Sequence, residues 1–448
     1  MEKVQNTLSI FALKILGIFS SYIFTFLVSK YYGASGWGTF SICLGVVTFG
    51  YLFGKFGFDM ALLKFSSTLR NSKEEFSLLK TIYQTAFKWL LPLGILITVC
   101  ITLNAKLLSN IFFNYDNNAG YFIIIALAII PTVFTLIDSE GLRGLGMTNK
   151  YVFLQNIALY LIASILLIVY IIYFGNKTDL KSIFIIYVIA SVVVFIICRI
   201  WWQNSVLSPY PISYSDKALT IKQIFNISYP MFWSNAMFVL INWTDTLMLG
   251  VFNSEADVGV YNAAFKISNL VTLPLFVITS IVAPKFANKY ALGDTKGLAQ
   301  IVNQSTAVIF LLTLPIFIII AIFPTLFLSI FGHSFVDGVP ILIILIFGQF
   351  FKSFCGSTDY LLQMTGHEKI FQKIILSAMV LNVLLNLILI PNFGSYGAAI
   401  ANTSTIIYWN IIATYYIKIK LNINALLNFS ILNLKSIKGI IAGNNNSK

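Results

Sequence analysis

The amino-acid sequence predicts an all-α integral membrane protein with twelve transmembrane helices in two six-helix lobes. Of the 448 residues, 58% are hydrophobic and only 10% are charged, and the mean hydropathy is +0.86. A chain of this composition has too little polar surface to fold as a soluble globule. Twelve apolar runs give the number of helices, and a weak internal repeat groups them into two lobes.

Each of the twelve runs contains about 20 apolar residues, which is enough for a helix to cross roughly 30 Å of hydrocarbon. The first six lie near residues 8–28, 40–65, 82–103, 121–142, 151–174 and 183–202. The second six lie near residues 224–252, 258–284, 301–323, 339–362, 370–390 and 396–417. We therefore expect an N-terminal lobe at residues 1–202, a cytoplasmic linker at 203–223 and a C-terminal lobe at 224–417.

The remaining residues, 418–448, are predicted to form a cytoplasmic tail. Within it, residues 421–441 mix Asn and Lys with apolar side chains. A crossing there would carry Lys435 and Lys438 to the outer side, against the distribution of the other charges. We therefore expect a helix that lies on the membrane surface.

A weak internal repeat relates the two lobes, because several residues between positions 31 and 138 return 221 positions later. The matched pairs are Gly38 and Gly259, Phe40 and Tyr261, Lys64 and Lys285, Phe65 and Phe286, and Asp138 and Asp359. Transporters are often built from such repeats. We expect the two lobes to superpose about an axis along the membrane normal.

The distribution of Lys and Arg predicts the orientation, since positively charged loops stay in the cytoplasm. Twenty of the 29 Lys and Arg residues fall on one side of the predicted helices, Arg199 among them, and four fall on the other. This bias places both termini in the cytoplasm. The net charge of +13 therefore indicates cytoplasmic loops, and we expect no nucleic-acid partner.

Neither catalytic nor metal-binding motifs occur in the sequence. It contains no G-x-x-x-x-G-K-[ST] nucleotide-binding loop and no H-E-x-x-H or S-x-x-K constellation. The four cysteines stand singly in apolar runs, and the two histidines are far apart in sequence. We expect a protein that is not an enzyme, with no metal, no disulfide and no cofactor.

Five lysines fall inside the predicted helices, where a charge costs about 3 kcal/mol on insertion scales and usually faces a cavity or a partner. They are Lys14, Lys55, Lys88, Lys266 and Lys352. Lys88 is close enough to the cytoplasmic end of its helix for its amine to reach the interface. Gly17, Ser21 and Thr25 continue the helix face of Lys14, which favours a polar, functional stripe.

Two of the lysines have an acidic residue at helical spacing. Asp59 follows Lys55 by four residues, so the two can form a buried ion pair that only holds helices together. Gln349, Lys352, Gly356 and Asp359 lie on one face of the predicted tenth helix. Asp245 lies near the outer end of the seventh helix, where we expect a structural or gating role.

Three segments resemble bacterial polysaccharide flippases of the multidrug/oligosaccharidyl-lipid/polysaccharide exporter superfamily. They are YYGASGWGTFSICLGVV at residues 31–47, GLRGLGMTNK at 141–150, and the stretch from Asp245 to Phe286. The resemblance implies a central cavity between the lobes that opens to either side in turn. The implied cargo is an undecaprenyl-diphosphate-linked oligosaccharide repeat unit, moved to the outer leaflet for O-antigen or capsule synthesis.

Under this interpretation the cavity lysines bind the substrate, whereas the acidic residues serve gating or ion coupling. The expected substrate-binding residues are Lys14, Lys55, Lys266 and Lys352, and the expected gating residues are Asp59, Asp245 and Asp359. Expected partners are the lipid-linked oligosaccharide, the membrane and polymer-assembly proteins. A multidrug antiporter of the same superfamily, or a membrane scaffold that transports nothing, remains as the alternative.

Overall fold

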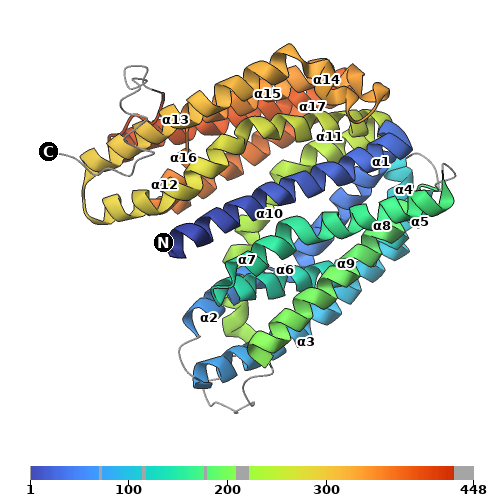
Figure 1. The fold of residues 1–448 in the computed structure, drawn as a ribbon, viewed down its shortest axis with the longest axis horizontal. Coiled ribbons are helices and arrows are strands. Elements are labelled where there is room, and N and C mark those ends of the chain that lie inside the picture. The colour runs from blue at the N-terminus through green and yellow to red at the C-terminus, as the bar shows by residue number, and fades with distance from the viewer. Residues whose placement is uncertain (1, 70–72, 114–117, 176–178, 208–220, 428–448) are drawn as a thin grey trace. The chain divides into compact units, whose positions relative to one another are not determined.

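A computed structural model describes residues 2–69, 73–113, 118–175, 179–207 and 221–427 (Figure 1). Every regular element within these ranges is a helix. The helices form two compact units, Met1–Gly259 and Val260–Lys448. The all-helical prediction is therefore confirmed. The predicted linker falls mostly on residues 208–220, which lie outside the described part of the chain.

Unit 1 begins with α1, a run of 54 residues. Its elements are α1 (Glu2–Lys55), α2 (Phe58–Thr68), α3 (Lys73–Leu103), α4 (Ala105–Phe113), α5 (Ala119–Ala126), α6 (Ile129–Gly144), α7 (Thr148–Val152), η2 (Phe153–Ala158), α8 (Leu159–Phe174), α9 (Lys181–Trp202), η3 (Gln203–Leu207) and α10 (Ile221–Phe252). Helix α11 (Glu255–Ser268) starts in unit 1 and continues in unit 2.

Unit 2 ends with a second 54-residue run, α17. Its elements after α11 are η4 (Asn269–Thr272), α12 (Leu273–Ala291), α13 (Thr295–Ile322), α14 (Pro324–Ser329), η5 (His333–Gly338), α15 (Val339–Cys355), α16 (Thr358–Met364) and α17 (Glu368–Leu421). Helices α13, α15 and α17 run alongside one another in Figure 1, and α15 packs against both of the others.

Ten helical stretches of the described chain are long and apolar enough to cross a membrane. The two longest, of 44 and 54 residues, are at least twice the roughly 20 residues that one crossing needs. The backbone of α1 leaves the helical conformation at Gly33 (φ 70°), and that of α17 does so at Gly394 (φ 55°). Both runs therefore consist of two helical segments joined at a glycine. The multi-pass membrane fold is confirmed, and the exact number of crossings stays a prediction.

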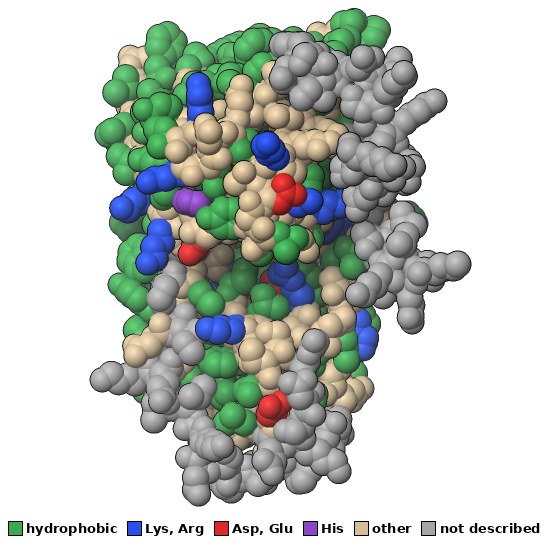
Figure 2. Space-filling model, turned by 90° about the vertical axis from the view of Figure 1, so that its left-hand side faces the viewer, with side chains coloured by type: hydrophobic (Ala, Val, Ile, Leu, Met, Phe, Trp, Pro, Cys, Tyr) green, Lys and Arg blue, Asp and Glu red, His purple; other side chains and the backbone are tan. Residues whose placement is uncertain are grey.

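Large hydrophobic side chains remain exposed on many helices, and Tyr173 on α8 is 81% exposed. A soluble protein rarely leaves extended apolar surface in water. Figure 2 shows one face of the molecule, on which Lys and Arg side chains (blue) are spread among polar and hydrophobic ones. Contact with lipid explains the exposed apolar surfaces of the helices. The Lys and Arg side chains on the face in Figure 2 can contact water or lipid headgroups.

The turn between α12 and α13 illustrates how local sequence ends one helix and starts the next. Gly293 takes a positive φ of 68°, which glycine adopts without steric cost. The Asp294 carboxylate then caps α13 by accepting from the Gly297 N–H at 2.7 Å. A hydrogen bond from Lys289 and this cap hold the pKa of the Asp294 carboxyl below its usual range.

The tail leaves α17 at Asn422, which has a positive φ of 55°. Residues 422–427 are not helical, and they pack on unit 2. Leu427 donates its N–H to the Phe354 carbonyl at 3.3 Å, and the Thr306 hydroxyl donates to the Ala425 carbonyl at 3.4 Å. The surface helix predicted for residues 421–441 therefore does not start there, and residues 428–448 lie outside the described chain.

Within unit 1, the backbones of α1 and the first turn of α11 touch at a pair of glycines. A Cβ on Gly38 would overlap the Glu255 carbonyl oxygen, and a Cβ on Gly259 would overlap the Ala34 carbonyl oxygen. These are two of the repeat-matched positions, since Gly259 and Glu255 lie 221 residues after Gly38 and Ala34. The two glycines that the sequence repeat matches therefore lie at the same contact between α1 and α11.

We predict that Gly38→Ala and Gly259→Ala each lower the thermal unfolding temperature of the detergent-solubilised protein. Each methyl group meets a helix backbone that can move only as a unit, and overpacking of this kind costs about 1–3 kcal/mol. Gly94→Ala in α3 is the control, because its Cβ would meet Ile130 at an ordinary 3.6 Å. Equal melting temperatures for Gly38→Ala and Gly94→Ala would contradict the prediction.

Candidate functional site

The break between α1 and α2 holds a close pair of opposite charges. The Lys55 amine donates to the Asp59 carboxylate at 2.6 Å. The Lys55 side chain is 15% exposed and Asp59 is buried. The predicted Lys55–Asp59 pairing is thus confirmed, but the uninterrupted helix expected over residues 40–65 is wrong, because α1 ends at Lys55 and α2 starts at Phe58.

Tertiary contacts with α10 explain why the chain breaks at this point. Phe56 and Gly57 both have a positive φ, of 42° and 73°. A Cβ on Gly57 would overlap the Ser228 carbonyl oxygen of α10. The Phe56 ring stacks on Phe225 and Phe232, with centroids 5.1 and 4.7 Å away. Aromatic stacking thus holds Phe56 in a conformation that non-glycine residues rarely adopt.

Lys14 is exposed on α1. The residues of the predicted polar stripe that follow it, in contrast, pack against the interior of unit 1. Gly17 packs so closely on Asn156 of η2 that a Cβ would lie 2.7 Å from the Asn156 Cβ. The Thr25 side chain is buried, and its hydroxyl donates to the Ser21 carbonyl at 2.9 Å. The stripe therefore provides close helix packing, and Lys14 is its accessible charge.

In unit 2, Lys266 and Lys352 lie on either side of a hydrogen bond between their helices. The Gln349 amide of α15 donates to the Asn269 side-chain oxygen at 3.4 Å. Lys266 lies one turn before Asn269, and Lys352 lies one turn after Gln349. Asn269 belongs to η4, which follows directly on α11, the helix of Lys266.

The Lys352 amine rests against aromatic rings, 5.6 Å from the centroid of Phe276 and 5.5 Å from that of Trp409. Such cation–π contacts stabilise a partly desolvated charge. Helix α15 ends at Cys355, and Gly356 has a φ of 70°. The continuous stripe predicted from Gln349 to Asp359 is therefore wrong, because Asp359 belongs to the first turn of α16.

The structure places the seven predicted site residues in both units. Lys14, Lys55, Asp59 and Asp245 belong to unit 1, and Lys266, Lys352 and Asp359 belong to unit 2. Asp245 is buried in α10. Lys55 and Asp59 are joined directly, whereas a cavity shared by all four lysines stays a prediction. Lys88 is exposed on α3, as its position near the helix end had indicated.

A buried polar cluster in unit 1 was not predicted from the sequence. Asp138 of α6 is 0% exposed, and it accepts from the Tyr83 hydroxyl at 2.6 Å and from Arg199 at 3.2 Å. Arg199 also donates to the Tyr83 hydroxyl. Arg199 lies in the last turn of α9, inside the helix predicted at residues 183–202, and its charge is paired within the unit. The sequence signal for this cluster was an Arg near the end of an apolar run, since such a charge needs a partner.

We predict that Arg199→Leu lowers stability by about 3–5 kcal/mol, because it leaves the Asp138 carboxylate buried without its countercharge. The double variant Asp138→Asn, Arg199→Leu should recover much of the loss, since no isolated charge remains. Lys289→Leu is the control, because its pair with Asp294 is well exposed and should matter little. Thermal unfolding in detergent measures all three, and a double variant no more stable than Arg199→Leu would contradict the explanation.

The sequence profile of a family described as "Polysaccharide biosynthesis protein" matches residues 33–340, more than half of the chain. The chain belongs to this polysaccharide biosynthesis family. The match begins at the break in α1 and includes the α1–α2 break, the Asp138 cluster and Lys266, and it ends before Lys352.

Two curated relatives share part of the sequence. The "Probable low-salt glycan biosynthesis flippase Agl15" of Haloferax volcanii is 23% identical over 197 residues, 44% of this chain and 42% of that protein. An uncharacterized membrane protein of Methanocaldococcus jannaschii is 26% identical over 223 residues, 47% of this chain and 42% of the relative. The matches span less than half the length of these relatives, so their whole activities do not carry over directly.

Solved structures with the same fold cover nearly the whole chain. The lipid II flippase MurJ in an inward closed conformation matches 99% of this chain and 94% of its own, with a TM-score of 0.72 at 15% identity. An inward-facing multidrug resistance MATE transporter of the MOP superfamily matches 93% and 98%, with a TM-score of 0.71 at 14% identity. This polysaccharide biosynthesis family member thus has the fold of MOP-superfamily transporters.

Proposed function

We propose that this protein is a flippase for undecaprenyl-diphosphate-linked oligosaccharide repeat units. It would move them from the cytoplasmic to the outer leaflet of the inner membrane, for O-antigen or capsular polysaccharide synthesis. Family membership supports polysaccharide synthesis, and the MOP fold supports transport. The observation that carries the proposal is the set of lysines inside otherwise apolar helices, Lys14, Lys55, Lys266 and Lys352.

The chemistry of the cargo gives these lysines a purpose. A diphosphate that enters the membrane loses its water and needs compensating positive charge, which acts strongly where the dielectric constant is low. Lys is a flexible point charge, whereas the planar fork of Arg binds phosphate in a fixed geometry. A chain of lysines can therefore pass a diphosphate from one amine to the next.

The proposed arrangement consists of twelve helices in two lobes, with both termini in the cytoplasm and the four lysines around one central cavity. The breaks of α1 and α17 at Gly33 and Gly394 support twelve helices, since each run is long enough for two crossings. Asp59 holds Lys55 until the cargo arrives, and Asp245 and Asp359 serve gating or ion coupling. Polymer-assembly proteins would receive the flipped unit.

Multidrug antiport is the second candidate, because the MATE transporter has a similar fold. Cationic drugs would require unpaired carboxylates in the membrane. In unit 1, Asp59 and Asp138 are both engaged with basic residues. The intramembrane lysines and the family match favour an anionic, sugar-bearing lipid instead.

We predict that Lys→Ala at positions 14, 55, 266 or 352 slows flipping of a fluorescent lipid-linked oligosaccharide in reconstituted vesicles at least several-fold, whereas Lys→Arg retains partial activity. Lys88→Ala is the matched control, because this exposed lysine lies outside the proposed path. Full flipping by the quadruple Ala variant would contradict the mechanism. Export of a cationic dye without any flipping would favour the multidrug antiporter.

A further inference from the structure

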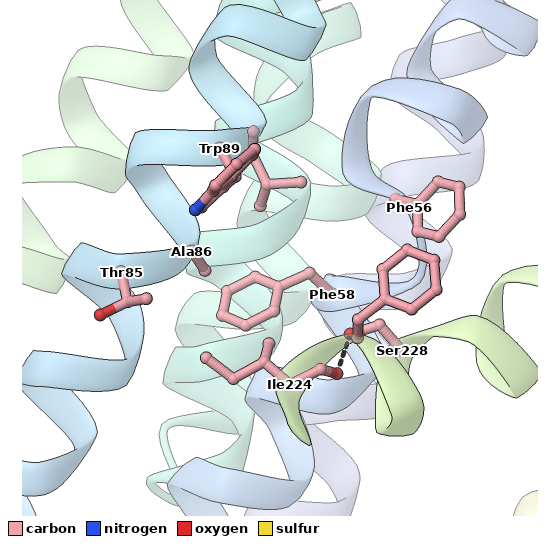
Figure 3. A pocket seen from close by; sticks show the side chains of 9 residues that line it. Phe56, Phe58, Thr85, Ala86, Trp89, Ile224 and Ser228 are labelled. Carbon is pink, nitrogen blue, oxygen red and sulfur yellow. Dashed lines mark hydrogen bonds between the residues drawn. The ribbon is translucent and has the colours of Figure 1, made fainter. Parts of the chain in front are cut away.

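An apolar pocket opens beside the α1–α2 break, within unit 1 (Figure 3). It encloses about 400 Å³ of empty space, counted out to its open mouth. Three helices supply its walls, and the lining residues are Phe56, Phe58, Thr85, Ala86, Trp89, Leu90, Ile224, Phe225 and Ser228. Figure 3 shows the rings of Phe56 and Phe58 facing the Trp89 and Ala86 wall of α3 across this space.

The pocket offers little to a polar ligand. The Ser228 hydroxyl donates to the Ile224 carbonyl of its own helix at 3.1 Å, drawn as the dashed line in Figure 3. Most other lining groups are hydrocarbon or aromatic. Trp89 is 61% exposed and Phe225 is 48% exposed, so large apolar surfaces remain uncovered at the mouth. An apolar chain in this space would make van der Waals contacts with these rings on several sides.

A charge lies directly beside this pocket along the chain. Phe56 and Phe58, which line it, flank Gly57 at the break, and Lys55 and Asp59 are the next residues on either side. The Lys55 ammonium has three N–H donors, of which the Asp59 contact uses one. The break therefore joins an apolar site to a lysine with donors to spare.

We propose that this pocket binds the first isoprene units of a polyprenyl diphosphate, with the diphosphate at Lys55. The proposal rests on the flippase function and identifies where the lipid part of the cargo is held. In a polyprenyl diphosphate the anion is bonded directly to the apolar chain. This matches Lys55 and Phe56, a charged and an apolar residue that are adjacent in sequence. In a phospholipid, glycerol and ester groups separate phosphate from acyl chain, and these polar groups would lie against the aromatic wall.

Photolabelling in vesicles tests the proposal without requiring transport. The probes are a diazirine-bearing farnesyl diphosphate and the matching diazirine-bearing farnesol, with labelled peptides identified by mass spectrometry. We expect both probes to label α3 around Ala86 and Trp89. Ala86→Trp fills the pocket and should reduce labelling by both probes at least ten-fold. Lys55→Gln should reduce labelling by the diphosphate and leave farnesol labelling unchanged.

Leu96→Trp is the matched control, because this exposed α3 residue lies outside the pocket. Thermal unfolding confirms that each variant is folded, and if Ala86→Trp does not fold, Ser228→Leu replaces it with the same expectation. Undiminished labelling in a folded, filled variant would overturn the site. Equal protection by excess phosphatidylglycerol and excess farnesyl diphosphate would overturn the isoprenoid assignment. Specific labelling without any flipping would instead uphold the pocket and refute the proposed transport.

Discussion

Direct backbone contact at Gly38 and Gly259 is the constraint that governs the packing of α1 against the first turn of α11. Each glycine faces the carbonyl of the residue four positions before the other, Glu255 or Ala34. The 221-residue offset of the sequence repeat exchanges these two contacts. Any side chain at either position would push both backbones apart. Neither contact leaves room for a Cβ, which is why glycine suits both positions.

Helix breaks provide a second organising element, and two of them place charges in similar ways. At the α1–α2 break a lysine ends one helix and Asp59 occupies the first turn of the next. At the α15–α16 break Lys352 lies in the last turn and Asp359 in the following first turn. A carboxylate is favourable near a helix N-terminus, and a cation is favourable near a C-terminus. A glycine with positive φ thus allows opposite charges to approach each other in the middle of a long apolar segment.

The features that depend on local sequence were predictable, whereas those that depend on tertiary contacts were not. Composition and run length predicted a helical membrane protein, and four-residue spacing predicted the Lys55–Asp59 pair. The break at Phe56 and Gly57 depends on Ser228, Phe225 and Phe232, which come from a distant helix. The Asp138–Arg199 pair spans 61 residues, and no spacing rule connects such positions. For the same reason, the end of α15 at Gly356 could not be recognised from an otherwise helical polar stripe.

The surroundings of Lys55 and Lys352 imply different tasks for two lysines of the same proposed path. Lys352 takes part in none of the four ion pairs found in the described chain, and aromatic rings flank its amine. Rings stabilise the charge without occupying its N–H donors, so an anion can bind there without breaking a direct ion pair. Lys55 already has Asp59, and the proposed diphosphate would have to share the amine with that carboxylate or replace it. Replacement leaves the buried carboxylate of Asp59 without its partner, which costs free energy. That free energy is recovered when the anion leaves and the ion pair forms again. Such a site would bind the proposed diphosphate weakly enough to release it, as the proposed flippase function requires.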